Sequence, residues 1–155
     1  MKINPKEVIA IASDHAGFAL KQLVEEQIKS YGLNVLDLGA LDESSVDYPV
    51  YGGKLALAIV AEEAVRGVGI CGTGIGMSIV LNRVPGVRAA LCHNSDTAEL
   101  ARRHNDANVL VLGSRIMDEG TSISCLKAFL ETGFDGGRHA LRVAMIDHIK
   151  EGSIE

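Results

Sequence analysis

The strongest constraint on the fold is an alternation of short apolar runs with longer stretches of helical periodicity. The apolar runs, rich in Val, Ile, Leu and Ala, cover residues 8–12, 35–38, 68–71, 87–91 and 109–112. Between and after them, helical spacing predicts helices at residues 18–31, 51–66, 76–82, 96–104, 119–130 and 138–150. Nearly continuous apolar strands that alternate with helices are typical of a parallel sheet covered on both faces. The sequence therefore predicts an α/β fold with five parallel strands.

Composition narrows the classes of protein that remain. The chain has 155 residues, of which 47% are hydrophobic and 23% charged, so it can bury a core as one domain. A net charge of -5 argues against a broad nucleic-acid-binding surface. The N-terminus lacks signal-peptide architecture, and no apolar run approaches the roughly 20 residues that span a bilayer. The three cysteines show no CxxC spacing, so we expect neither a disulfide framework nor a zinc site, and a reducing cytoplasm fits.

Polar residues follow four of the predicted strands. They stand at residues 13–17, 71–76, 92–94 and 113–115. Ligands of open parallel sheets bind outside the carboxyl ends of the strands, near a switch in strand order. We therefore expect the functional site at this edge of the sheet.

One of these segments is a glycine loop, in the stretch VGICGTGIGMS. Gly72, Gly74 and Gly76 let backbone N–H groups turn toward a ligand, and the loop opens a helix, so it predicts an anion cradle. The spacing is G-x-G-x-G, with Met77 where the dinucleotide motif has its last glycine, and no Walker lysine follows. A nucleotide site is therefore the weaker interpretation. A tight turn alone would explain one or two of these glycines, but not three.

Cys71 stands directly before the cradle. Helix N-termini favour the thiolate form of a cysteine. A thiolate beside an oxyanion hole could attack an acyl group, or it could take a proton next to a carbonyl while the N–H groups hold the enediolate. The alternative is a small buried hydrophobe, which is the interpretation that we give to Cys92 and Cys125.

The histidines allow more than one interpretation. Asp14 and His15 lie between a strand and a helix, so they are either an N-cap with a surface histidine or an acid–base and binding pair. His104 shares a helical stripe with Leu100 and Ala101. By pattern alone, this favours a histidine packed in the core over a catalytic one.

Two arginines near the C-terminus break a local rule. Arg138 and Arg142 are spaced i and i+4, so they share a helix face, and they stand at the positive end of the helix dipole. A bound phosphate would relieve both penalties, because guanidinium groups match phosphate oxygens. The alternative is a solvated basic patch.

With these motifs the chain resembles ribose-5-phosphate isomerase type B, within the sugar-phosphate isomerase family that also holds the galactose-6-phosphate isomerase subunits. The matching stretches run in order along nearly the whole chain: ASDHAGFALK, VDYPVYG, GICGTGIGMSI, ARRHNDANVLVLGSR and FDGGRHALRV. The resemblance is specific for the family and less so for the substrate.

The resemblance implies a Rossmann-like three-layer α/β/α sandwich formed by residues 1–155 as one domain. It implies a cytoplasmic enzyme of carbohydrate metabolism, in the pentose phosphate pathway, that interconverts an aldose phosphate and a ketose phosphate without a metal or cofactor. It further implies a homodimer or homotetramer with active sites at the subunit interface, and a C-terminal helix at about residues 137–150 that docks on a partner subunit. A small sugar phosphate is then the partner, with neither nucleic acid nor membrane.

The resemblance also implies roles for individual residues. Cys71 would be the base that moves a proton between C1 and C2. The loop Gly72–Gly76, which includes Gly74 and Ile75, would stabilise the enediolate, assisted by Thr73. Asp14 and His104 would transfer protons on the sugar oxygens and open the ring. The phosphate would be held by His15, Arg138 and Arg142. Asn105 and Tyr48 would contact the sugar. We expect His104 and Asn105 to come from the second subunit.

Several alternatives remain open on the sequence. A hexose phosphate such as allose or galactose 6-phosphate would need a longer pocket. A non-catalytic sugar-phosphate or nucleotide-binding module would need the loop and the arginines but not the thiol, and a cysteine acyltransferase would form covalent intermediates. The segment Cys92–Asn94 receives no role.

Overall fold

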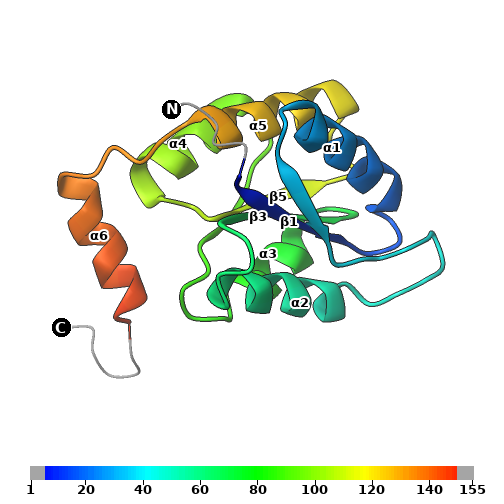
Figure 1. Ribbon diagram of the computed structural model, residues 1–155. Helices are drawn as coiled ribbons and strands as arrows, with labels where there is room; N and C mark the ends of the chain where they lie inside the picture. The colour runs from blue at the N-terminus through cyan, green and yellow to red at the C-terminus, as the bar shows by residue number, and fades with distance from the viewer. Residues whose placement is uncertain (1–5, 150–155) are drawn as a thin grey trace.

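The computed structural model describes residues 6–149, which form a five-stranded, all-parallel sheet with helices on both faces (Figure 1). The strand order is β2-β1-β3-β5-β4. The strands are β1 (Val8–Ser13), β2 (Asn34–Asp37), β3 (Arg66–Cys71), β4 (Ala89–Leu91) and β5 (Val109–Gly113). The helices are α1 (Phe18–Ser30), α2 (Tyr48–Val60), α3 (Ile75–Leu81), α4 (Ser95–Asn105), α5 (Glu119–Glu131) and α6 (Arg138–Asp147). The predicted Rossmann-like α/β/α fold is confirmed.

One predicted helix was wrong at both ends, for identifiable reasons. The helix expected over residues 51–66 begins at Tyr48, because Pro49 is tolerated in a first helical turn, and it ends at Val60. Arg66 is instead the first residue of β3 and is buried. Its guanidinium donates to the carbonyls of Phe129 and Leu130 and forms an ion pair with Glu7, so a cation is accommodated inside a strand.

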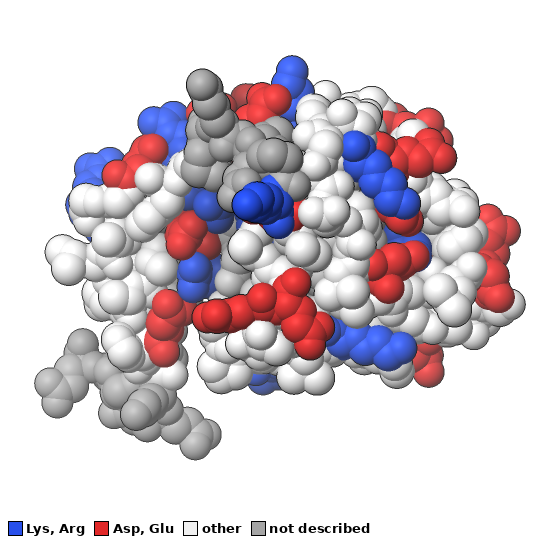
Figure 2. All heavy atoms as spheres, viewed as in Figure 1, with Lys and Arg blue, Asp and Glu red and all other residues white. Residues whose placement is uncertain are grey.

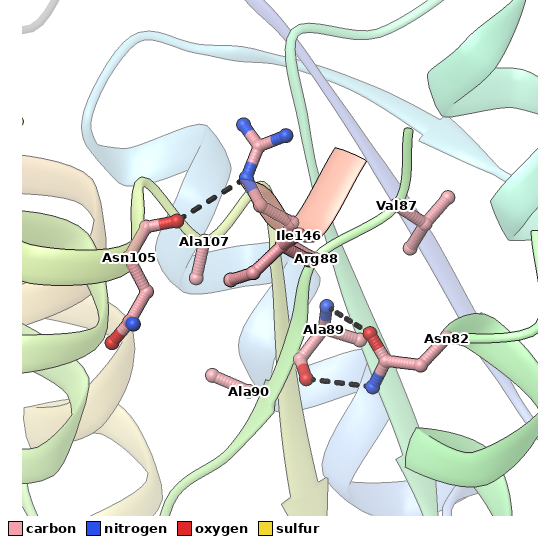
Figure 3. Close-up of a pocket in the computed structure, with 8 residues that line it drawn as sticks. All are labelled: Asn82, Val87, Arg88, Ala89, Ala90, Asn105, Ala107 and Ile146. Atoms are coloured by element: carbon pink, nitrogen blue, oxygen red, sulfur yellow. Dashed lines mark hydrogen bonds between the residues drawn. The ribbon is translucent and has the colours of Figure 1, made fainter. Parts of the chain in front are cut away.

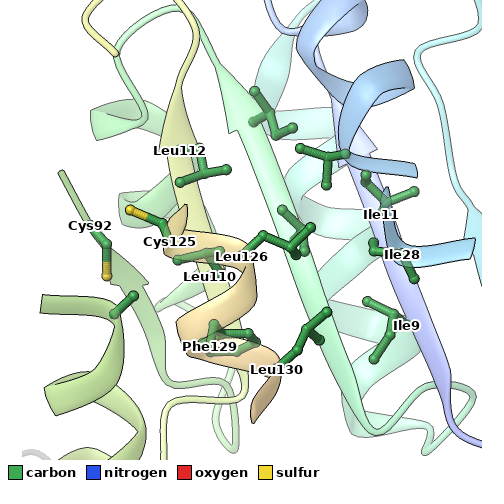
Figure 4. Close-up of a cluster of buried hydrophobic side chains, with 14 of the residues drawn as sticks. Ile9, Ile11, Ile28, Cys92, Leu110, Leu112, Cys125, Leu126, Phe129 and Leu130 are labelled. Atoms are coloured by element: carbon green, nitrogen blue, oxygen red, sulfur yellow. The ribbon is translucent and has the colours of Figure 1, made fainter. Parts of the chain in front are cut away.

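Alternate residues of the central strands build two apolar cores. Ile9 and Ile11 of β1 face the layer of α1, α4 and α5, where they join Leu110, Leu112 and Phe129 (Figure 4). The intervening residues of the same strand face α2 and α3; they are Ala10 and Ala12, which pack with Leu55, Met77 and Leu81. Because helices cover both faces, a site for a polar ligand is left only at the two ends of the strands.

Helix α6 stands apart from the body and contacts it through α4 (Figure 1). Val143 is its one buried residue, whereas Leu141 and Met145 are 73% and 70% exposed. The helix predicted to reach residue 150 ends earlier, at Asp147 with His148 as its C-cap, and residue 150 itself lies outside the described residues. No helix among residues 6–149 is long and apolar enough to cross a membrane. In the view of Figure 2, acidic and basic side chains are interspersed over the surface.

Candidate active site

The carboxyl ends of β1, β3 and β5 meet at one edge of the sheet and are joined by backbone hydrogen bonds. The amide of Asp14 donates to the carbonyl of Ile70 at 3.2 Å, across from β1 to β3. The amides of Ser114 and Arg115 donate to the carbonyls of Cys71 and Gly72 at 2.9 and 2.8 Å, across from β5 to β3. Three loops that are distant in sequence are therefore held at fixed positions around the end of β3.

Cys71 lies at the centre of this edge. Its side chain is 4% exposed, and its Sγ accepts a hydrogen bond from the Gly74 N–H at 3.1 Å. Gly74 has a φ of 77°, and a Cβ there would lie 2.5 Å from the Leu91 side chain, so only glycine fits. The loop therefore directs a backbone N–H at the Cys71 sulfur.

The rest of the glycine loop contacts a side chain from α2. A Cβ at Gly76 would lie 2.6 and 2.7 Å from ring carbons of Tyr48, so the tyrosine ring packs directly against the loop. Thr73 is exposed, and its Oγ1 accepts from the Ile75 N–H at 3.3 Å. The structure thus brings Tyr48, Thr73 and the glycine loop together beside Cys71.

Asp14 and His15 lie at the same edge, after β1. The N-cap of α1 is Gly17, so Asp14 is not the cap residue; its Oδ1 accepts from the Gly17 N–H at 2.9 Å, and the side chain is 7% exposed. Nδ1 of His15 lies 3.2 Å from the amide nitrogen and 3.1 Å from the carbonyl oxygen of Val46. The half-buried His15 is therefore fixed in place rather than free on the surface. Next to Asp14, Ser13 Oγ is the one buried side-chain oxygen or nitrogen among the described residues without a hydrogen-bond partner.

His104 and Asn105 lie toward the amino ends of the strands, on the side of the sheet opposite to Cys71. Helix α4 begins after the carboxyl end of β4 and runs back for 11 residues, about 16 Å, to end before β5 begins. The pattern that favours a core position for His104 is misleading. The half-buried ring stacks on the ring of His139 instead, with centroids 4.2 Å apart and planes 5° from parallel.

Asn105 borders a pocket of about 470 Å³ between β4, α4 and α6 (Figure 3). The pocket is lined by Asn82, Val87, Arg88, Ala89, Ala90, Asn105, Ala107 and Ile146. Arg88 donates to the Asn105 carbonyl at 3.2 Å and forms ion pairs with Asp106 and Asp147. Arg88 therefore ties the end of α4 to the end of α6, and no sequence pattern predicts this role.

Arg138 and Arg142 lie on α6, at the same edge as His104. Both are exposed, and neither guanidinium forms an ion pair or a hydrogen bond within residues 6–149. Desolvation, followed by the charges of His104 and these two arginines, lowers the pKa of His139. The two guanidinium groups, without an acidic partner among residues 6–149, suit an anion.

One group of side chains at this edge has ligand atoms suited to a metal. The ligand atoms of His104, Asp135 and His139 all lie within 4.8 Å of one another. However, Asp135 already forms an ion pair with Arg103, and Arg138 is close by. These positive neighbours disfavour a cation at this position.

Two polar segments outside the predicted site have clear positions. Arg115 follows β5, and its side chain lies about 3.3 Å from where a Cβ of Gly72 would stand, so it borders the glycine loop. The only sequence signal for this position was that Arg115 follows a predicted strand. In the unassigned segment, Asn94 caps α4 by accepting from the Thr97 N–H.

Comparison with known proteins agrees with this arrangement. A model of the family described as Ribose/Galactose Isomerase matches residues 9–146. The chain belongs to this family. Ribose-5-phosphate isomerase B of Escherichia coli (strain K12) is 39% identical over 92% of this chain and 96% of its own. A putative sugar phosphate isomerase of Rickettsia bellii is 47% identical over 90% of this chain and 96% of its own.

The solved structures give the same result. A ribose-5-phosphate isomerase B of Clostridium thermocellum superposes with a TM-score of 0.91 at 45% identity, over 93% of this chain and 97% of that one. Membership of the Ribose/Galactose Isomerase family confirms the prediction of an aldose–ketose isomerase. It also favours catalysis over the binding-module and acyltransferase alternatives.

Proposed function

We propose that this member of the Ribose/Galactose Isomerase family interconverts ribose 5-phosphate and ribulose 5-phosphate through an enediolate, with Cys71 as the base. One observation carries the proposal: a nearly buried thiol accepts a hydrogen bond from the Gly74 N–H, beside a loop whose glycines expose further backbone. The relatives named ribose-5-phosphate isomerase B support the choice of a pentose phosphate.

The proton transfer uses the thiolate and the loop together. In the direction from aldose to ketose, Cys71 takes the proton from C2, and the electron pair moves to form the enediolate while O1 gains charge. The same thiol then returns the proton to C1. Backbone N–H groups of residues 72–76, with the Thr73 hydroxyl, hold the charged oxygen. General acid–base steps of this kind contribute about 10² to 10⁴ in rate.

The phosphate and the sugar oxygens fall to other side chains. With Nδ1 held by the Val46 backbone, His15 has Nε2 left for a phosphate oxygen. Arg138 and Arg142, unpaired within residues 6–149, supply the guanidinium groups. Asp14 and His104 move protons on the sugar oxygens and open the ring, and Tyr48 and Asn105 contact the sugar.

These side chains serve one small substrate only if two copies of the chain combine. Cys71, Asp14 and Tyr48 are at one edge of the sheet, and the helix that ends in His104 spans about 16 Å between the edges. Exposed apolar residues lie on α6 and on α2 and α3, among them Leu141, Met145, Val50, Ile75 and Ile79. We propose that α6 docks on a partner subunit, covers these residues and brings His104 and Asn105 to the partner's Cys71 edge.

A hexose 6-phosphate is the second candidate substrate, because the family description includes galactose. The substrate phosphate would then bind one carbon further from the reacting centre. Turnover of allose or galactose 6-phosphate in place of ribose 5-phosphate would favour this candidate.

The test is proton NMR of ribose 5-phosphate with the pure protein in heavy water, without added metal. Wild type is expected to form the ketose and to introduce deuterium at the exchanging carbon. Cys71→Ala should lose at least about 100-fold in kcat, since it lacks the base. Cys92→Ala is the matched control: it removes a buried thiol at the end of β4 and should leave turnover unchanged. Full turnover by folded Cys71→Ala would remove the thiol from the mechanism.

A further inference from the structure

A fully buried lysine lies beneath the proposed active site. Lys21 of α1 is 1% exposed, and its Nζ lies 2.6 Å from both carboxylate oxygens of Asp37, at the end of β2. Burying a charged pair usually contributes no more to stability than apolar side chains of similar volume would. Only Lys21 of this pair is fully buried, and a buried charge that stability does not require suggests a functional reason for it.

On the sheet side, the pair connects to Asp14 through a turn. Asp37 Oδ1 accepts from the Gly39 N–H at 2.9 Å. The carbonyl of Gly39 accepts from the Ser13 N–H at 2.7 Å, and the Ala40 N–H donates to the carbonyl of Ser13 at 2.8 Å. The position of the Asp37 carboxylate therefore sets the backbone of the residue that immediately precedes Asp14.

On the helix side, the pair connects to the Asp14 carboxylate through the first turn of α1. The Lys21 N–H donates to the Gly17 carbonyl at 2.8 Å, and the Gly17 N–H donates to Asp14 Oδ1 at 2.9 Å. Gly17 itself packs on β3, because a Cβ there would lie 2.8 Å from the Ile70 side chain. The contacts form a closed ring, in the order Asp14, Gly17, Lys21, Asp37, Gly39, Ser13 and back to Asp14.

We propose that the Lys21–Asp37 ion pair is a positioning device that fixes the Asp14 carboxylate for its proton transfers. The pair touches no substrate; it closes the ring between α1 and the turn after β2. This inference rests on the proposed role of Asp14. A small displacement of a reacting group can cost about 10²-fold in rate, so loss of the pair should lower kcat and leave the phosphate contacts, and hence KM, nearly unchanged.

The variant that tests this is Lys21→Met with Asp37→Asn, which removes both charges and keeps an oxygen that can accept from the Gly39 N–H. We expect kcat to fall about 10- to 100-fold, KM to change less than about threefold, and the Gly17 amide resonance to shift. Asp37→Asn alone, at a side chain that is 31% exposed, is the milder variant should the double one fold poorly. Lys29→Met is the matched control on the same helix, where an exposed lysine pairs with Glu25.

Combination with Asp14→Asn separates positioning from general destabilisation. If the pair acts through Asp14, adding Lys21→Met and Asp37→Asn to Asp14→Asn should lower kcat no further. A further fall of kcat in the triple variant relative to Asp14→Asn would overturn the inference and leave the proposed function intact. Wild-type kcat in the folded double variant would do the same. Full activity of Asp14→Asn would instead refute the role of Asp14, and this inference with it, while the Cys71 test stands by itself.

Discussion

At the scale of single residues, the surroundings of Cys71, the thiol proposed as the base, differ from those of the other two cysteines. Cys71 ends a strand where the Gly74 N–H meets its sulfur. Cys125 is fully buried in the core, where desolvation first, and then the neighbouring Cys92, raise its pKa to about 11. Burial also raises the pKa of Cys92. The sequence could single out Cys71 as the candidate base because only this cysteine adjoins the three glycines.

The raised pKa of Cys125 predicts a loss of stability at alkaline pH. The thiol ionises near pH 9 in the unfolded chain, yet in the folded protein it keeps its proton to about pH 11, so the folded state binds more protons in between. The free energy of unfolding should therefore fall as pH rises from 9 to 11, by up to about 3 kcal/mol from this group. Urea unfolding across this range measures it. In Cys125→Ala the free energy of unfolding should fall less steeply with pH than in wild type. An equally steep fall would contradict the raised pKa of Cys125.

Other residue positions could not be predicted from local pattern. His104 has the spacing of a core residue, but the direction of α4 places it at an edge, where it stacks on His139. The contact of Tyr48 with Gly76 arises because α2 packs on α3. Such contacts depend on how elements far apart in sequence are arranged, which no single motif encodes.

At the scale of elements, periodicity located the strands and helices, and errors arose where a charge or a proline interrupted the pattern. By pattern, Arg66 resembles the end of a helix. The ion-pair partner that allows it to lie inside a strand, Glu7, is far away in the sequence. Pro49 lies before the predicted start of α2, although a first helical turn tolerates it. In both cases a tertiary contact or a backbone rule determined the boundary.

Adjacent glycines in α2 provide a matched test of how this helix packs. A Cβ at Gly52 would lie 2.9 Å from the Met77 sulfur and 3.1 Å from Val80, whereas a Cβ at Gly53 would meet nothing within 4 Å. Gly53→Ala should stabilise the protein by about 0.5–1 kcal/mol through helix propensity. Gly52→Ala should destabilise it by about 1–3 kcal/mol through overpacking against α3. Urea unfolding compares them, and equal effects of the same sign would contradict the close packing of α2 on α3.

At the scale of the whole molecule, the sheet separates two sets of proposed site residues. Asp14 and Cys71 lie at its carboxyl edge, and His104, Asn105 and Arg138 lie toward the other. The sequence singled out both sets as site residues, and the topology places them at opposite ends of the strands. The central claim is therefore that each active site combines the edges of two copies.

The most direct test is complementation between inactive variants. Cys71→Ala and His104→Ala would be unfolded together in urea, refolded as a mixture and assayed with ribose 5-phosphate. Half of the dimers would be mixed, each with one intact site of two, so about a quarter of wild-type activity should return. Cys71→Ala mixed with Asp14→Asn is the control; both changes affect the same edge, so it should stay inactive. Recovery only in the first mixture is the predicted result, and an inactive first mixture whose mixed dimers have formed would contradict the shared site.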